Sequence, residues 1–234
     1  MRGVLLAGGT GSRLLPLTRV TNKHLLPVGA VPMIFHPLRA LAAAGMREVL
    51  VVTGVEHMGD VVGTLGSGAE FGLELTWKVQ DEAGGIAQAL GLAEQFAAGG
   101  DVLVVLGDNV FSAPLAPEVE AFRSHRGARI LLSEVDHPER FGCPRFAGER
   151  IAHIEEKPAR PASRYAVTGI YLYEADVFDV IRTLSPSARG ELEITDVNNH
   201  YLRQGRLDWG VLQGWWTDAG THASLTRANE LARG

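Results

Sequence analysis

The residues of this chain whose types could do chemistry begin in a glycine-rich segment near its N-terminus. Residues 4–13 read V-L-L-A-G-G-T-G-S-R, an apolar run that passes directly into a turn closed by Arg13, and Lys23 follows ten residues later. Glycines lack a Cβ, so backbone N–H groups in such a turn can approach an anion closely. A strand, a glycine-rich turn and two cations therefore predict a site for the phosphates of a nucleoside triphosphate.

The spacing of these residues excludes the two commonest nucleotide-binding motifs. A dinucleotide-binding fingerprint needs G-x-G-x-x-G and an acidic residue about 20 positions further on, but position 14 is leucine and residues 27–36 contain no Asp or Glu. A P-loop needs G-x-x-x-x-G-K-[ST], and counting from Gly8 its second glycine falls on Arg13. A plain tight turn between a strand and a helix is the structural alternative, but packing gives no reason for Arg13 and Lys23 to follow such a turn.

Two aspartates far apart in the sequence are candidate metal ligands. Asp108 follows the run D-V-L-V-V-L of residues 101–106 in the motif G-D-N, and Asp218 stands in T-D-A-G-T. Mg²⁺ in nucleotide sites takes one or two carboxylates together with phosphate oxygens and water, which these two residues could supply. Taken singly, Asp108 could equally serve an Asx-turn and Asp218 the start of a helix.

Composition narrows the classes of protein. The 234 residues are 46% apolar, enough for a sizeable core, and carry a net charge of −5 with acids and bases interleaved. No basic stripe argues for nucleic acid and no polybasic face for a membrane surface, and no stretch nears the roughly 18 apolar residues of a membrane span. Cys143, the single cysteine, excludes an internal disulfide and a thiolate metal site, and we interpret it as a small core or turn residue. Met1 leads into the first strand with no signal-peptide pattern, so we expect a cytoplasmic protein.

The first part of the chain, residues 1–136, alternates strands and helices. Apolar runs predict strands at 4–7, 48–52, 73–79, 101–106 and 129–135, and helical spacing predicts helices at 32–44 (ended by Gly45), 57–65, 85–96 and 117–125. This alternation indicates an α/β fold with a doubly wound, mostly parallel sheet. Ligands of such sheets bind beyond the carboxyl ends of the strands. The glycine-rich turn, the turn after Val79 and the G-D-N motif should therefore meet at one crevice.

After residue 136 the pattern changes to shorter pieces separated by proline-rich turns. Strands are predicted at 145–146, 150–154, 166–173, 208–212 and 214–216, and helices at 175–183, at 193–204 and from His222 onward. We interpret residues 137–222 as a small mixed sugar-binding lobe beside the Rossmann-like nucleotide-binding lobe of 1–136, with a terminal helix at 222–234. The whole chain is then a single domain.

Several motifs together resemble one enzyme family. The pattern L-x-G-G-x-G-x-R-L, with K-x-L-L-P behind it, is similar to the signature of sugar-1-phosphate nucleotidyltransferases. The more specific pieces G-I-A-Q-A (85–89), G-D-N-V-F (107–111), I-E-E-K-P (154–158), P-S-A-R-G-E-L-E-I-T-D-V (186–197) and W-T-D-A-G-T-H (216–222) resemble bacterial glucose-1-phosphate thymidylyltransferases. The resemblance runs from residue 3 to about residue 222. It implies transfer of a nucleotidyl group from dTTP to glucose 1-phosphate, giving dTDP-glucose and pyrophosphate.

The same resemblance assigns roles to individual residues. On the nucleotide side, Gln80 and Gly85 would pair with the pyrimidine edge, and the phosphates and nucleoside would meet Leu6, Gly8, Gly9, Gly11, Ser12 and Arg13. On the sugar side, Gly142, Glu156 and Val167 would hold the sugar and Lys157 its phosphate. Asp108 and Asp218 would bind Mg²⁺, with Asp108 also counted among the nucleotide-binding residues. Arg13, Lys23 and Lys157 would be the catalytic cations, because in-line attack of one polyanion on another needs alignment and relief of charge rather than a strong base.

Two departures from the family pattern leave specificity open. The base loop has Ala83-Gly84 where Pro-Asp is usual, and R-F-G is followed by Cys143-Pro144 where a plain strand is expected. Transfer from UTP, ATP or GTP, another hexose or cyclitol phosphate, and a non-catalytic nucleotide-sugar-binding paralogue remain alternatives. The acidic tract E-L-E-I-T-D-V (191–197) has helical spacing, and we predict that it is structural.

The C-terminal part of the sequence bears on regulation. Only 16 residues follow Asp218, enough for a helix of about four turns, whereas longer thymidylyltransferases carry extra helices that help to form a second nucleotide site. We therefore expect no allosteric nucleotide site, a simple homo-oligomer such as a dimer, and inhibition by product that is competitive with the triphosphate.

Overall fold

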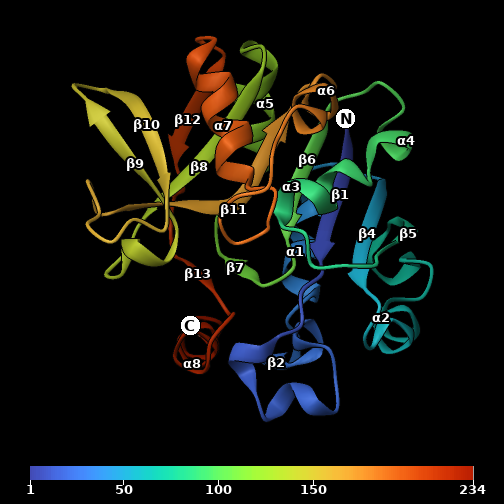
Figure 1. Ribbon diagram of the computed structural model, residues 1–234. Helices are drawn as coiled ribbons and strands as arrows, with labels where there is room; N and C mark the ends of the chain where they lie inside the picture. The colour runs from blue at the N-terminus through green and yellow to red at the C-terminus, as the bar shows by residue number, and fades with distance from the viewer. Residues whose placement is uncertain (234) are drawn as a thin grey trace.

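The computed structural model describes residues 1–233, and a seven-stranded sheet runs through its centre (Figure 1). Its strands lie in the order β12-β8-β11-β6-β1-β4-β5. Their bounds are β1 Arg2–Ala7, β4 Glu48–Gly54, β5 Glu74–Gln80, β6 Val102–Leu106, β8 Ala128–Glu134, β11 Tyr165–Tyr173 and β12 Leu207–Val211. The predicted α/β fold with a mostly parallel, doubly wound sheet is confirmed.

One strand departs from the parallel arrangement. β1, β4, β5 and β6 are parallel to one another, and β12 is parallel to β8, but β11 is antiparallel to both β6 and β8. Between Val167 and Tyr171 the register against β8 shifts, because Val167 pairs with Leu132 and Tyr171 with Ile130. Two extra residues of β11 therefore bulge out at this point, next to the C-terminal end of β6.

Helices cover both faces of the sheet, since successive residues of its strands belong to different cores. On β1, Val4 and Leu6 face a core completed by α3 (Ile86–Gly91), α4 (Glu94–Ala97), α6 (Val177–Arg182) and α7 (Ile194–Arg203). Leu5 and Ala7 face a core completed by α1 (Phe35–Ala43), α2 (Met58–Leu65) and α5 (Ala116–Ser124). Burial on both faces explains why the central strands β1, β4 and β6 are continuous apolar runs rather than alternating ones.

Some predicted helices differ from the observed ones. The helix expected at 85–96 is two short helices, α3 and α4, with a break at residues 92 and 93. The helix expected from residue 32 begins only at Phe35, because Val31–Pro32 forms β3, which pairs with β2 (Pro27–Val28). Proline has no backbone N–H to donate to a helical hydrogen bond, so Pro32 is better placed before the helix than inside it.

Smaller elements complete the edge of the sheet where the strands β1 and β6 end. The 3₁₀ helices η1 (Ser12–Leu14), η2 (Leu17–Arg19) and η3 (Lys23–Leu25) follow β1, whereas η4 (Ala69–Phe71) precedes β5 at the opposite edge of the sheet. The pair β7 (Asn109–Phe111) and β13 (Trp216–Asp218) packs with α8 (His222–Leu231) around a third small core. The predicted strand at 214–216 thus lies two residues further on. In Figure 1 β13 descends from the sheet toward α8, which lies near β2.

A two-stranded ribbon stands beside the sheet. β9 (Gly142–Ala147) and β10 (Arg150–Glu156) are antiparallel, follow η5 (Pro138–Arg140), and extend further toward the pocket than the predicted strands at 145–146 and 150–154. Cys143 is buried in this ribbon, as expected of a small core residue. Helices long and apolar enough to cross a membrane are absent from residues 1–233.

Candidate active site

The glycine-rich turn lies directly after the C-terminal end of β1. Gly9 and Gly11 have φ angles of 90° and 64°, in the left-handed region that glycine adopts without strain. A Cβ on Gly8 would lie 2.6 Å from Oε1 of Gln80, which comes from the end of β5, so glycine lets the Gln80 side chain keep its place here. The turn then continues into η1, which carries Arg13.

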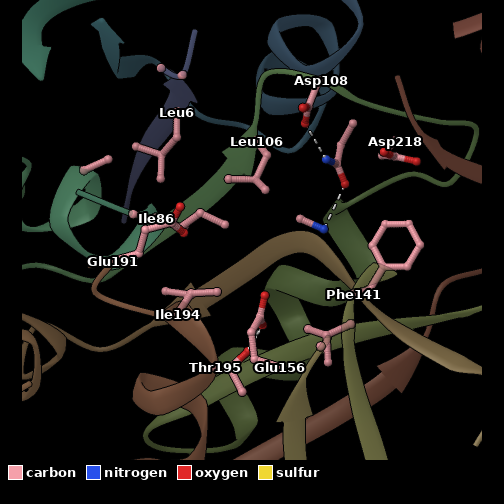
Figure 2. Close-up of a pocket in the computed structure, with 18 of the residues that line it drawn as sticks. Leu6, Ile86, Leu106, Asp108, Phe141, Glu156, Glu191, Ile194, Thr195 and Asp218 are labelled. Carbon is pink, nitrogen blue, oxygen red and sulfur yellow. Dashed lines mark hydrogen bonds between the residues drawn. The ribbon is translucent and has the colours of Figure 1, made fainter. Parts of the chain in front are cut away.

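Two carboxylates and a guanidinium converge on one point across this turn. Asp108 follows β6, and Asp218 ends β13, where it pairs with Asn109 in the β7–β13 ladder. A Cβ built on Gly220 would lie 3.3 Å from Nη2 of Arg13, 3.3 Å from Oδ2 of Asp218 and 3.5 Å from Oδ2 of Asp108. Figure 2 shows Asp108 and Asp218 at the same end of the pocket. Residues far apart in sequence therefore form one cluster, as the sheet topology predicts.

Each of the two carboxylates has its own cation. Nζ of Lys23 donates to Oδ2 of Asp108 at 2.6 Å, and Nη2 of Arg140 donates to Oδ2 of Asp218 at 2.8 Å. Burial by itself would raise the pKa of Asp108, but the Lys23 ammonium, together with His24 and the hydrogen bond from Asn109, outweighs burial and holds that pKa well below its usual range. Burial raises the pKa of Asp218 and the nearby Asp108 carboxylate adds to this, against the opposing effect of Arg140. The two acids therefore differ in how readily they take up a proton.

Asn109 ties this cluster to two strands. Its Nδ2 donates to Oδ1 of Asp108 at 3.0 Å, and its Oδ1 accepts from the backbone N–H of Gly169 at 2.8 Å and from Nε1 of Trp216 at 2.7 Å. The dashed lines in Figure 2 follow the first two of these bonds. Asn109 is buried and its oxygen accepts two hydrogen bonds, so its side-chain amide has one orientation. Through this amide, Asp108 is held in place relative to the bulge of β11 and to β13.

The opposite end of the pocket is built around Glu156. Its Oε2 accepts from the hydroxyl of Thr195 at 2.5 Å, and its Oε1 lies 3.4 Å from Nζ of Lys157 and 3.3 Å from Nη2 of Arg189. Lys157 has a φ of 45°, a left-handed conformation that few non-glycine residues adopt, and its backbone N–H donates to the carbonyl of Phe141 at 3.0 Å. Glu156 and Lys157 thus face the space where hydroxyl and phosphate groups could bind, and Arg189 supports Glu156 from behind the lining.

A third part of the pocket holds Gln80 and Gly85. The backbone carbonyl and N–H of Leu192 pair with Ala87 and Gly84, so the loop that precedes α3 is fastened to the segment before α7. A Cβ on Gly85, whose φ is 97°, would lie 2.5 Å from the carbonyl oxygen of Leu192. The loop can therefore approach that segment only because position 85 is glycine.

These parts line one cavity of about 340 Å³. Of the residues that the sequence predicted for the site, the following line it: Leu6, Gly8, Gly9, Arg13, Lys23, Gln80, Gly85, Asp108, Gly142, Glu156, Lys157, Val167 and Asp218. Gly11 and Ser12 do not. Gly11 packs against Thr18 and Lys23, and Ser12 is an exposed residue at the start of η1.

The donor set suits a magnesium ion. No group of three or more His, Cys, Asp and Glu side chains that could hold a metal occurs within residues 1–233. Asp108 and Asp218 offer hard oxygen ligands that converge within contact distance of Gly220, and Mg²⁺ completes such a pair with phosphate oxygens and water. The residues present therefore fit a magnesium ion that is bound together with a nucleotide, and do not form a closed protein cage.

The sequence matches the nucleotidyl transferase family over residues 2–233. The chain belongs to this family. Among curated relatives, it is 46% identical to a glucose-1-phosphate thymidylyltransferase of Actinoplanes sp., across all of this chain and 78% of that protein, and 42% identical to that of Mycobacterium tuberculosis, across all of this chain and 82% of that protein.

Solved structures agree with this assignment. A Bacillus anthracis protein, provisionally assigned as a glucose-1-phosphate thymidylyltransferase and solved with sucrose, has a TM-score of 0.96 and 58% identity, covering all of this chain and 95% of that one. A UDP-glucose pyrophosphorylase with bound UDP-glucose has a TM-score of 0.88 at 21% identity, covering 99% of this chain and 98% of that one, which shows the shared fold.

Sequence reasoning missed several pocket residues of this nucleotidyl transferase. Arg140 bonds to Asp218 and Asn109 to Asp108, and only the folded chain brings Arg140 to Asp218. The prediction that the tract 191–197 is structural was wrong in part. α7 begins only at Ile194, so Glu191 lies in an extended segment, and Glu191, Ile194 and Thr195 line the pocket (Figure 2). The adjacency of Asn109 to Asp108 in the G-D-N motif was the one usable signal.

Proposed function

We propose that this protein transfers a nucleotidyl group from dTTP to glucose 1-phosphate, forming dTDP-glucose and pyrophosphate. The observation that carries the proposal is a single cavity lined at one end by the glycine-rich turn and two carboxylates, and at the other by Glu156 and Lys157. The names of the relatives that match the whole chain at 40–46% identity support the choice of substrates.

The reaction needs no covalent intermediate with the protein. An oxygen of the sugar 1-phosphate forms a bond to the α-phosphorus, and the bond from that phosphorus to the bridging oxygen of pyrophosphate breaks. The attacking oxygen is already anionic, so the residues must align two polyanions and relieve their repulsion. Lys157 would hold the attacking phosphate, Arg13 would stabilise charge on the leaving pyrophosphate, and Lys23 would assist on that side.

Magnesium is part of the proposal. Asp108 and Asp218 would hold Mg²⁺ against the triphosphate, where the ion would offset charge at the α-phosphate. We also propose that the protein is a homo-oligomer, with a dimer as the favoured form. Light scattering at several protein concentrations tests that proposal, and a monomer at all of them contradicts it.

A matrix of substrates tests the proposed activity. Pyrophosphate release is measured for dTTP, UTP, CTP, ATP and GTP, each with glucose 1-phosphate and several other sugar 1-phosphates, with and without Mg²⁺. We expect dTTP with glucose 1-phosphate to give the highest kcat/KM, and no release without a divalent cation. No release with any pair would contradict the proposal.

UTP is the second candidate donor. Uracil and thymine offer the same hydrogen-bonding edge and differ only in the 5-methyl group, so an amide at Gln80 reads both alike. A preference for a purine triphosphate would contradict the role of Gln80. A non-catalytic paralogue is disfavoured because Arg13, Lys157, Asp108 and Asp218 all line the cavity.

A further inference from the structure

The side-chain amide of Gln80 is held from its nitrogen end. Nε2 donates to the carbonyl oxygen of Gly85 at 3.3 Å and to Oε1 of Gln88 at 2.5 Å. A backbone carbonyl can only accept, so this contact favours the NH₂ group of Gln80 over its oxygen on the side of Gly85. Gln80 is 7% exposed, and both hydrogens of its amide are used within the protein.

The oxygen end of the same amide is left for a ligand. Oε1 of Gln80 points toward the glycine-rich turn, where a Cβ on Gly8 would lie 2.6 Å from it. No N–H or O–H of the described residues donates a hydrogen bond to this oxygen. The pocket therefore presents an acceptor, and no donor, from this side chain.

Gln88 reaches Gln80 because the chain has no side chain at position 84. Gln88 lies in the first turn of α3, and a Cβ on Gly84 would lie 2.5 Å from its Cδ and 2.7 Å from its Oε1. The backbone at Gly84 does not have a positive φ, so an L residue could adopt it. The amide of Gln88 occupies the space that a side chain at position 84 would take, so a larger residue there would displace that amide.

We propose that Gln88 is a positioning residue that sets the base specificity of the pocket by fixing the orientation of the Gln80 amide. This rests on the proposed function, in which Gln80 reads the base. With the amide fixed, and with N3 as the ring position that meets it in the proposed pairing, the base must offer an N–H at N3 to Oε1 of Gln80. Thymine and uracil have such a group at N3, whereas N3 of cytosine carries a lone pair that would face the lone pairs of Oε1. Gln88 thus selects keto pyrimidines over cytosine.

The contact to Gly85 alone holds the amide less firmly. At 3.3 Å it is long for an N–H···O bond, whereas the contact to Gln88 is short. Without Gln88, the Gln80 amide can rotate so that its NH₂ group faces the base, which suits cytosine. A site that hydrogen-bonds one edge rejects a mismatched edge strongly because buried polar groups are left unpaired, and freedom to rotate removes that rejection.

Two variants at position 88 separate orientation from packing. Gln88→Leu has a similar size but no acceptor, whereas Gln88→Glu keeps acceptor oxygens toward Nε2 of Gln80. We measure kcat/KM for dTTP and dCTP with glucose 1-phosphate, and binding of dTTP and dCTP by calorimetry. We expect Gln88→Leu to lower the ratio of dTTP to dCTP by about tenfold or more, and Gln88→Glu to keep it within about threefold of the wild type.

A variant that leaves Gln88 in place provides an independent test. Gly84→Ala places a methyl group where the Gln88 amide lies, and the flexible side chain must move away from Gln80. The ratio should fall in the same direction as in Gln88→Leu. An unchanged ratio in Gln88→Leu, or a fall in Gln88→Glu as large as in Gln88→Leu, would overturn the inference.

The binding measurement distinguishes this inference from the proposed function. If the wild type binds dTTP in preference to dCTP but releases no pyrophosphate, the proposed function fails, and the calorimetric ratios still decide the role of Gln88. If the wild type turns over dTTP and the ratio does not respond to Gln88→Leu, the proposed function stands and the inference fails. A wild type that does not discriminate between dTTP and dCTP also overturns it.

Discussion

Nζ of Lys23 lies 2.6 Å from Oδ2 of Asp108, and only 13% and 14% of these two side chains is exposed. Removing one partner of a buried pair leaves a charge without compensation, whereas removing both leaves none. The pair also lies beside the glycine-rich turn, so the carboxylate proposed to bind Mg²⁺ has a cation next to it before any ligand arrives.

A double-mutant cycle measures the coupling free energy between Lys23 and Asp108. We expect Lys23→Met and Asp108→Asn each to lower the free energy of unfolding, and the double variant to lower it by about 2–3 kcal/mol less than the sum. Urea unfolding without Mg²⁺ or nucleotide gives the coupling. The exposed pair Arg227 and Glu230 is the control, with coupling below about 0.5 kcal/mol. Additive effects at Lys23 and Asp108 would contradict a coupled pair.

The two carboxylates should be essential to turnover. Asp108→Asn and Asp218→Asn each remove one charge from a site that balances several phosphate charges, so we expect each to lower kcat/KM by about a hundredfold or more. Circular dichroism checks that the variants are folded. Asp101→Asn is the matched control, because Asp101 lies beside the opposite end of β6. Rates near those of the wild type in both site variants would rule out the metal assignment.

Arg140 should set the acid limb of the pH profile. Burial raises the pKa of Asp218, and Arg140 opposes that rise, so Arg140→Met should raise the pKa further. In the proposed mechanism Asp218 binds Mg²⁺ as a carboxylate, so we expect activity to be lost as the pH falls through this pKa. We therefore expect the acid limb of kcat/KM to move to higher pH in Arg140→Met and to move less in Arg140→Lys. If the acid limb of kcat/KM lies at the same pH in both variants as in the wild type, Arg140 does not influence the pKa of Asp218.

His24 should make stability depend on pH. Burial first, and then the neighbouring Lys23 ammonium, lowers the pKa of His24 from 6.5 to about 3. The unfolded chain takes up a proton near pH 6.5 and the folded chain only near pH 3, so this residue's contribution is complete above pH 6.5 and is lost as the pH falls between these values. The slope is at most about 1.4 kcal/mol per pH unit.

A non-titrating variant isolates that effect. His24→Gln keeps an N–H donor for Oδ1 of Asn22, with which the imidazole Nδ1 bonds at 2.7 Å, but it has no proton to gain. We expect the free energy of unfolding to fall less steeply between pH 6.5 and pH 4 in this variant than in the wild type. Parallel slopes would show that His24 does not titrate on unfolding.

The strands and the motifs at their ends could be predicted from sequence because both depend on local pattern. The run 101–106 and the G-D-N motif after it place Asp108 at the edge of the sheet, and the sheet rule then brings it to the glycine-rich turn. Arg140 and Thr195 could not be predicted in this way, because their partners Asp218 and Glu156 lie 78 and 39 residues away in sequence. The antiparallel direction of β11 could not be predicted either, because long connections allow a strand to pair in either direction and the sequence pattern of the strand is the same in both cases.

The bulge in β11 limits insertions and deletions in this part of the chain. Val167, Gly169 and Tyr171 all line the pocket, at every second residue along the strand. The bulge adds two residues relative to β8, an even number, so side chains before and after it keep the same facing. Deleting a single residue between 167 and 171 would reverse the facing of the residues before the bulge. The side chain of Val167 would then point into the core on the opposite face of the sheet, and the side chain of an adjacent residue would point into the pocket. Natural length variation here should therefore occur in steps of two residues.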